Sequence, residues 1–112
     1  MALIRDSKLA NLLREGHFEE FNRLAAQEPP DLRNADLRML DLRHADLTHA
    51  DLRGAYLRNA DLRGLDLSEA SLEGASLHDT RVSGVLFPTA LNAEEIRLSL
   101  TFGTRMRAHT MR

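Results

Sequence analysis

The stretch ADLTHADLRGAYLRNADLRG, residues 45–64, places a leucine at every fifth position and an alanine two positions before each leucine. Divided into fives, residues 30–89 form twelve consecutive units without an insertion. The central position of the units holds leucine from Leu32 to Leu77, followed by Val82 and Phe87. Such self-similarity predicts one small structural unit that is stacked many times.

A period of five excludes a straight helix and a continuous strand. Five residues turn an α-helix by about 140°, so the leucines would spread over its whole surface. In a strand, five is odd and successive leucines would alternate between the two faces. Within one unit, however, alanine and leucine are two apart and share a face. The chain therefore has to bend once per unit, at positions such as Asn34, Gly54 and Gly74, whose residue types favour turns.

The result is a coil with corners, and successive coils stack about 4.8 Å apart. Alanine and the central residue of each unit point into its interior. The predicted core comprises Leu37, Leu42, Leu47, Leu52, Leu57, Leu62, Leu67, Leu72, Leu77, Val82, Phe87, Ala35, Ala45, Ala50, Ala55, Ala60, Ala70 and Ala75.

The run A-D/N-L-x-x resembles the pentapeptide-repeat family, and it recurs in successive units of residues 30–89. The resemblance implies a β-solenoid, specifically a right-handed quadrilateral parallel β-helix with four units per coil and about three coils. The longer period of a leucine-rich repeat is absent.

Both ends of such a stack need caps, because each end exposes apolar interior and unpaired backbone. Residues 7–15 and 17–27 have the apolar spacing of a short helical pair or of one broken helix, which Pro29 and Pro30 end. Residues 92–100 begin with Asn92 as a helix cap and Glu95 three residues later. We expect one folding unit with an N-terminal cap (1–29), a repeat region (30–89), and a C-terminal cap with a basic, frayed tail (90–112).

Composition narrows the class of protein. The chain has 112 residues, a net charge of −2 and no cysteine, which argues against nucleic-acid binding and against a disulfide framework. No segment has the apolar length of a signal peptide core or a membrane span. We therefore expect a cytoplasmic protein without direct nucleic-acid or membrane contact, and without a cofactor.

The outward residues suggest a binding surface. If four units make one coil, one side of the stack is built on Leu47, Leu67 and Phe87. That side carries Asp46, Asp66 and Glu69 but no lysine or arginine. This acidic wall is a candidate for binding a basic patch on a partner protein. The alternative is an ordinary solvated surface, because three carboxylates can gather by chance.

Three apolar residues near the C-terminus form a second candidate surface. Leu86 stands where most units have an acidic residue, and Leu98 and Phe102 belong to the expected C-terminal helix. They form either a dimer patch or an internal contact, so the chain is expected to be a monomer or a homodimer.

Nothing in the sequence predicts catalysis. His44 and His49 occupy successive corners without a third ligand in register, which makes a metal site improbable. The aspartates face outward beside arginines, where nothing raises a pKa for acid–base chemistry. The sequence predicts a non-enzymatic scaffold for protein–protein interaction. The family resemblance supplies an alternative, a DNA-mimicking binder of DNA gyrase or topoisomerase of the quinolone- or toxin-protection type, although three coils span only about 14 Å.

Overall fold

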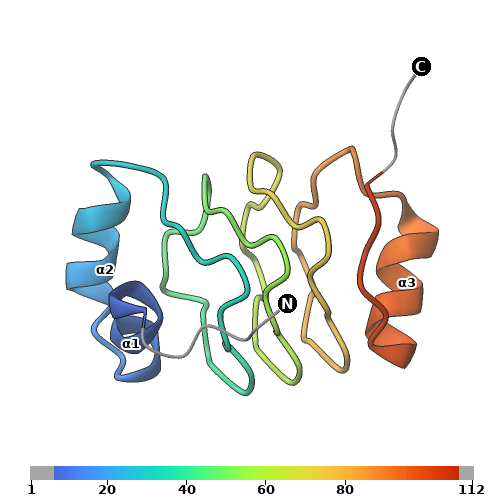
Figure 1. Ribbon diagram of the computed structural model, residues 1–112, viewed down its shortest axis with the longest axis horizontal. Coiled ribbons are helices and arrows are strands. Elements are labelled where there is room, and N and C mark those ends of the chain that lie inside the picture. Colours follow the sequence, from blue (N-terminus) through green and yellow to red (C-terminus); the bar gives the residue numbers. More distant parts are fainter. Residues whose placement is uncertain (1–6, 109–112) are drawn as a thin grey trace.

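The computed structural model describes residues 7–108 and consists of stacked turns of chain between helices (Figure 1). Helices α1 (Lys8–Arg14) and α2 (Phe18–Ala25) lie at one end of the stack, and α3 (Ala93–Phe102) lies at the other. Gly16, with φ of +76°, separates the first two helices. The two ends of the repeat region are thus both covered by helix, as expected from the apolar spacing of the flanking segments.

The repeat region returns over itself every twenty residues. Seven parallel bridges each join residues twenty apart, as in Asp31 with Asp51 and Asp51 with Ser71. Four five-residue units therefore make one coil. We call residues 30–34, 50–54 and 70–74 the first side, residues 35–39, 55–59 and 75–79 the second, residues 40–44, 60–64 and 80–84 the third, and residues 45–49, 65–69 and 85–89 the fourth.

The coils pair through isolated bridges and not through continuous strands. The N–H of the central residue of a unit donates to a carbonyl of the next coil, as in Leu52 N to Ser71 O at 2.8 Å. The carbonyl two residues earlier in the same unit accepts from an N–H of that next coil, as in Ser71 N to Ala50 O at 3.0 Å. Corner residues also donate to the next coil, as in Gly54 N to Glu73 O at 3.0 Å, although their backbone is not extended. The expected β-structure is consequently present only as short rungs in the described residues.

Most corners use left-handed backbone. Asn34, Gly54 and Gly74 have φ of 59°, 72° and 79° at the corner that follows the first side. Met39 also adopts this conformation, with φ of 66°, although it has a bulky side chain. The corner histidines His44 and His49 do not, so those two corners turn without a left-handed residue.

The interior is aliphatic, and the predicted leucines and alanines line it. Leu37, Leu42, Leu47, Leu52, Leu57, Leu62, Leu67, Leu72 and Leu77 are buried, as are Ala35, Ala45, Ala50, Ala55, Ala60, Ala70 and Ala75. Val82 and Phe87 are exceptions, because both remain partly exposed where core burial was expected. They lie in the last coil, where no further coil covers the third and fourth sides.

Helices α1 and α2 supply polar groups to the open backbone of the first coil. The Asn22 amide nitrogen donates to His44 O at 3.0 Å, and its oxygen accepts from Asp46 N at 2.7 Å. The Arg14 guanidinium donates to Asp36 O at 2.6 Å. Side chains of the caps thus replace bonds that a preceding coil would make.

The C-terminal cap combines α3 with the segment that follows it. Asn92 caps α3 by accepting from Glu95 N at 2.9 Å. Ser99 is fully buried, and its hydroxyl accepts from Leu77 N at 2.9 Å and donates to Thr104 O at 2.6 Å. These bonds cover the second side of the last coil.

The expected basic, frayed tail comprises residues 105–112, and this expectation is wrong for residues 105–108. Met106 is 1% exposed and pairs with the last coil through Met106 N to Ala75 O at 3.0 Å and Gly74 N to Met106 O. Glu95 holds this segment by accepting from Arg107 N at 2.9 Å and from its guanidinium at 2.8 Å. Residues 109–112 of the expected tail lie outside the described residues.

Candidate partner-binding surface

The Asp-Leu-Arg units form closed local ion pairs. In residues 31–33, the Arg33 Nε and Nη2 atoms both donate to the Asp31 carboxylate at 2.9 Å, and Arg33 N donates to the same carboxylate at 3.2 Å. The same arrangement recurs at Arg38, Arg43, Arg53 and Arg63. Each such aspartate both stabilises a turn and neutralises its own arginine.

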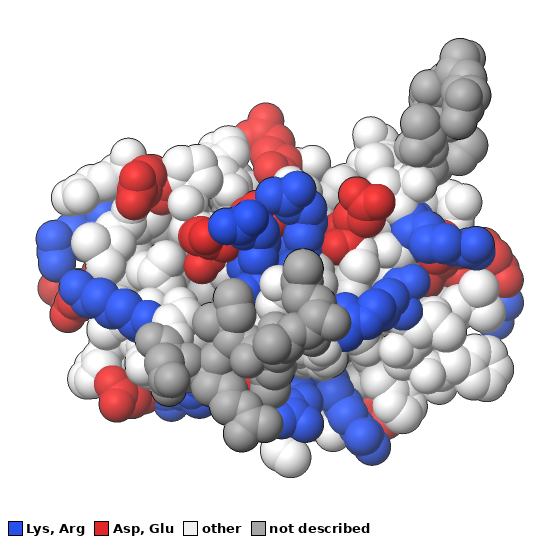
Figure 2. All heavy atoms as spheres, viewed as in Figure 1, with Lys and Arg blue, Asp and Glu red and all other residues white. Residues whose placement is uncertain are grey.

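Arginines on the first and third sides also reach the next coil. Arg33 Nε lies 3.8 Å from the Asp51 carboxylate, and Arg43 Nε lies 3.4 Å from that of Asp61. The hydrogen-bonded guanidinium of Arg63, aided by Arg43, lowers the pKa of Asp61 to about 2. On these two sides, stacked carboxylates are therefore separated by cations. Figure 2 shows such interleaving of arginine with acidic residues over one face of the coils.

The fourth side replaces arginine with hydroxyl residues. Thr48 donates to the Asp46 carboxylate through its N–H at 3.2 Å and its hydroxyl at 2.8 Å. Ser68 does the same to Asp66 at 3.0 and 2.6 Å, which lowers the pKa of that carboxyl. The turn-stabilising role of the aspartate is preserved, but its negative charge has no cationic partner within the unit.

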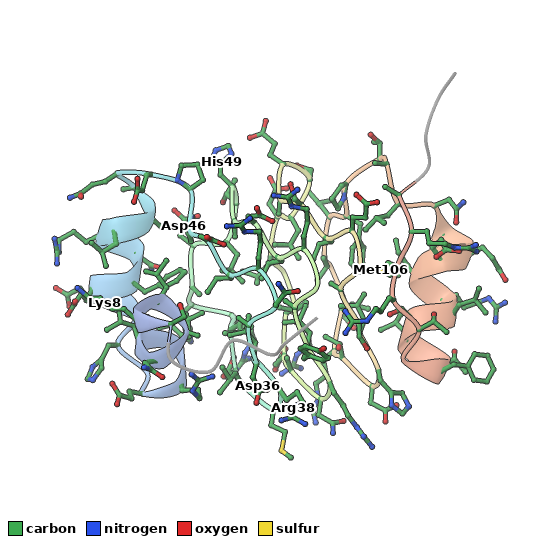
Figure 3. The ribbon with its side chains drawn as sticks, in the orientation of Figure 1. Lys8, Asp36, Arg38, Asp46, His49 and Met106 are labelled. Atoms are coloured by element: carbon green, nitrogen blue, oxygen red, sulfur yellow. The ribbon has the colours of Figure 1, made fainter. Side chains whose placement is uncertain are left out.

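Two further groups complete the fourth side. His49 Nδ1 lies 3.4 Å from the Glu69 carboxylate, which joins the corners of the first and second coils. The bridge expected between Asp46 and Asp66 is absent from the described pairs, whereas Asp66 pairs with Leu86 above it. Asp46 and His49 lie on one edge of the first coil, and Asp36 and Arg38 lie on the opposite edge (Figure 3). Asp46, Asp66 and Glu69 belong to units of the fourth side, and their role as a binding wall stays a prediction.

The residues of the predicted dimer patch come from two elements, the fourth side and α3. Leu86 is 58% exposed on the fourth side, where it pairs with Asp66. Phe102 is 68% exposed at the end of α3, beside Gly103, which lies close to His78 on the second side. Leu98 precedes Phe102 by one helical turn and is partly buried. The apolar exposure therefore falls in two places, and a homodimer stays a prediction.

Sequence reasoning missed the role of Tyr56. Its ring receives the guanidinium of Arg105 at 4.9 Å from the centroid, and its hydroxyl accepts a hydrogen bond from the same group. Arg105 also donates to Gly74 O at 2.9 Å. Tyr56 therefore seats the C-terminal segment on the second side. The available signal was that Tyr56 stands at a position that holds aspartate in most units. The sequence did not indicate its partner, because Arg105 lies 49 residues further along the chain.

Other classes of site have little support in the described region. Within residues 7–108, no three histidine, aspartate or glutamate side chains gather in a way that could hold a metal ion. A surface hollow of about 540 Å³ is lined by Arg33, Arg53, Glu73 and Arg105, among others, and two of its arginines are already paired with aspartates. The three helices in the described region are too short or too polar to cross a membrane.

The twenty-residue return and the aliphatic interior define a repeat protein built from stacked coils. The sequence profile of pentapeptide repeats matches eight copies within residues 31–64 and 50–87, which together cover half of the chain. The chain therefore belongs to the pentapeptide-repeat family. Members of this family are generally non-enzymatic repeat scaffolds for protein interaction. No curated protein and no solved structure shows significant similarity to the chain.

Proposed function

We propose that this chain is a non-enzymatic, cytoplasmic scaffold that binds a basic patch of a partner protein through its fourth side. The observation that carries the proposal is the replacement of arginine by Thr48 and Ser68, whose hydroxyls donate to Asp46 and Asp66. A side with Asp46, Asp66 and Glu69 and no lysine or arginine attracts cations, whereas Asp41, Asp51 and Asp61 on the neighbouring sides pair with arginines.

We also propose the finer architecture implied by the family, a right-handed quadrilateral parallel β-helix of three coils. The parallel bridges between residues twenty apart support four units per coil. An experimental structure that shows a left-handed winding would contradict it.

The charge layout does not favour a DNA mimic. Five Asp-Leu-Arg units neutralise the aspartates that a DNA-like surface would need to keep free. The gyrase alternative stays a prediction without specific support from the geometry, and a supercoiling assay with excess protein tests it.

The test of the scaffold proposal gives the fourth side the chemistry of its neighbours. The double variant Thr48→Arg with Ser68→Arg creates two more Asp-Leu-Arg units, which should pair locally and cancel the charge of Asp46 and Asp66. Partners recovered by affinity purification from the native cell are then titrated against purified wild type and variant. We expect the arginine variant to bind at least about tenfold more weakly, because two uncompensated charges are removed.

The matched control is Thr48→Gln with Ser68→Gln, which adds similar bulk without charge. We expect this variant to retain most of the binding. Unchanged affinity of the arginine variant for every recovered partner would show that the fourth side is not the binding surface.

A further inference from the structure

The C-terminal edge of the last coil carries unpaired backbone groups in regular register. On the third side, Leu42 N donates to Asp61 O at 3.0 Å and Leu62 N donates to Arg81 O at 2.9 Å. The next donor of this column, Val82 N, has no hydrogen-bond partner among residues 7–108. Among the backbone groups of residues 80–87 that have no hydrogen-bond partner within residues 7–108, we call the N–H groups of Val82, Gly84 and Phe87 and the carbonyls of Thr80 and Val85 the open edge.

The C-terminal cap covers the other part of the same coil. On the second side, Leu77 N donates to the Ser99 hydroxyl at 2.9 Å, and Asp79 N donates to Leu100 O at 3.1 Å. The open edge is therefore a local gap in the cap, since equivalent groups a few residues earlier are satisfied.

Side-chain burial gives an independent indication of the same gap. The central leucines of the first two coils are at most 1% exposed, whereas Val82 and Phe87 are partly exposed. Leu86 beside them is 58% exposed. Apolar side chains at sheet edges become buried when a further strand is added.

At the opposite end of the third side, Leu40 is also partly exposed, but the central residue of the unit is covered. Asp41 N and O have no hydrogen-bond partner in the described part of the chain. However, Leu42 next to it is 0% exposed, and the Phe18 ring of α2 packs edge-on against His44 with centroids 6.1 Å apart. Of the two ends of the third side, the C-terminal end is the one where the central side chain of the unit, Val82, is partly exposed beside an unpaired N–H.

Arg81 specifies the charge of an added strand. It occupies the column of Asp41 and Asp61, directly above Asp61 through their bridge. Unlike Arg43 and Arg63, it has no ion pair with a described residue. A residue added to the column above Arg81 would place its side chain next to this exposed guanidinium, which favours a carboxylate there.

We infer that the open edge binds an extended segment of a partner protein, which adds as a further rung above Arg81. The segment carries an acidic residue that pairs with Arg81 and an aliphatic residue that covers Val82. Its backbone accepts from Val82 N–H and donates to the Thr80 carbonyl, as Arg81 does with Leu62 and Ala60 below. This inference rests on the proposed scaffold function but uses a different surface from the fourth side.

The test uses the full chain labelled with ¹⁵N and a capped synthetic peptide that copies residues 60–67, ADLRGLDL. That segment already pairs beneath residues 81–86 and presents an aspartate at the required place. Amide hydrogen exchange is followed with increasing peptide, up to about 1 mM because single added strands bind weakly. In the free chain we expect rapid exchange at Val82 and Gly84 and slow exchange at Leu62 and Gly64, which are paired.

At 90% occupancy the peptide should slow exchange at Val82 and Gly84 about tenfold and leave Leu62 and Gly64 unchanged. A second peptide, with its first aspartate replaced by lysine, should bind about fivefold more weakly. Arg81→Glu should reverse this preference between the two peptides. Arg63→Gln is the matched control one coil below, and it should preserve the preference.

Three results would overturn the inference. The first is slow exchange at Val82 and Gly84 in the free chain, and its loss on dilution would identify a second copy as the occupant. The second is no added protection with either peptide. The third is equal protection by both peptides, which would remove the role of Arg81. The Thr48→Arg with Ser68→Arg variant should bind the peptide normally, so failure at the open edge and failure of the fourth-side proposal are distinguishable.

Discussion

Met39 is the residue whose backbone fits its side chain least well. It adopts φ of 66° at a corner, and its side chain is 73% exposed. The left-handed conformation costs a residue with a β-carbon roughly 1–2 kcal/mol, whereas asparagine tolerates it better. The side chain is mostly in solvent, so little packing opposes a replacement.

We therefore expect Met39→Asn to raise the free energy of unfolding by about 1 kcal/mol. Chemical denaturation with a two-state fit measures the change. Met39→Ala, which removes the side chain without favouring the left-handed region, should show no gain. An equal gain in both variants would assign the effect to loss of the exposed methionine instead.

Gly54 and Gly64 occupy similar backbone in different surroundings. They have φ of 72° and 78°, but a β-carbon on Gly54 would lie 2.2 Å from the Asn34 Oδ1 atom, whereas one on Gly64 meets nothing within 4 Å. Gly64→Ala should cost only the backbone strain, about 1–2 kcal/mol. Gly54→Ala should cost more, because Asn34 has to move.

A double-mutant cycle isolates that contact. In an Asn34→Gly background, the cost of Gly54→Ala should fall to that of Gly64→Ala, as measured by urea denaturation. If the two costs already agree in the wild-type background, the Asn34 side chain moves aside freely.

At the scale of elements, the caps work through side chains that replace missing coils. Asn22 of α2 binds the backbone on both sides of Ala45, and Ser99 of α3 satisfies Leu77 N. The segment after α3 depends on Glu95, which is 9% exposed and holds Arg107. The pKa of Glu95 is lowered, first by its hydrogen bond with the Arg107 side chain.

The interaction of Glu95 with Arg107 makes the stability of the C-terminal segment sensitive to acid. A carboxyl whose pKa is lower in the folded protein than in the unfolded chain stabilises the fold at any pH above its unfolded-state pKa, which is near 4.5 for Glu95. This contribution is lost as the pH falls through the folded-state pKa. Between pH 7 and pH 3, Glu95→Gln should therefore lose less stability than the wild type does. Thermal unfolding over this range measures the difference, with Glu28→Gln as the control at an exposed position that has no ion pair with a described residue. If stability falls with pH equally in Glu95→Gln and in the wild type, the interaction of Glu95 with Arg107 does not stabilise the fold.

At the scale of the whole molecule, one aliphatic interior joins three coils and two caps. Leu57 lies in the middle coil and is 0% exposed, whereas Leu86 is 58% exposed on the last coil. Truncation in the middle leaves a cavity between two coils, which cannot both collapse onto it.

We expect Leu57→Ala to cost about 2–5 kcal/mol, and Leu86→Ala to cost less than about 0.5 kcal/mol. Guanidinium denaturation followed by circular dichroism tests both. A similar cost at the two positions would show that Leu86 is covered in solution, which would also count against a free open edge.

Much of the interior could be predicted because the five-residue pattern is strictly local. Leu37 and Ala35 face inward by the alternation within one unit, and one bend per unit repeats this for the next. The acidic fourth side was predictable for the same reason, since four units per coil assign Asp46 and Asp66 to one column. Whether Leu86, Leu98 and Phe102 form one patch depends on the direction of α3 across the last coil, which the repeat does not specify, so that patch stays a prediction.

By itself, the sequence determined which side chains line the coil and which carry the charge of each side, since both depend on spacing along a regular repeat. Only the tertiary structure decided that Arg105 lies on Tyr56, that Met106 continues the last coil, and that Val82 and Phe87 are left partly uncovered. These features arise at the contact between the C-terminal cap, whose sequence is not repetitive, and the last coil, whose sequence is. The pairing there joins residues far apart in the chain, and no period in the sequence records it.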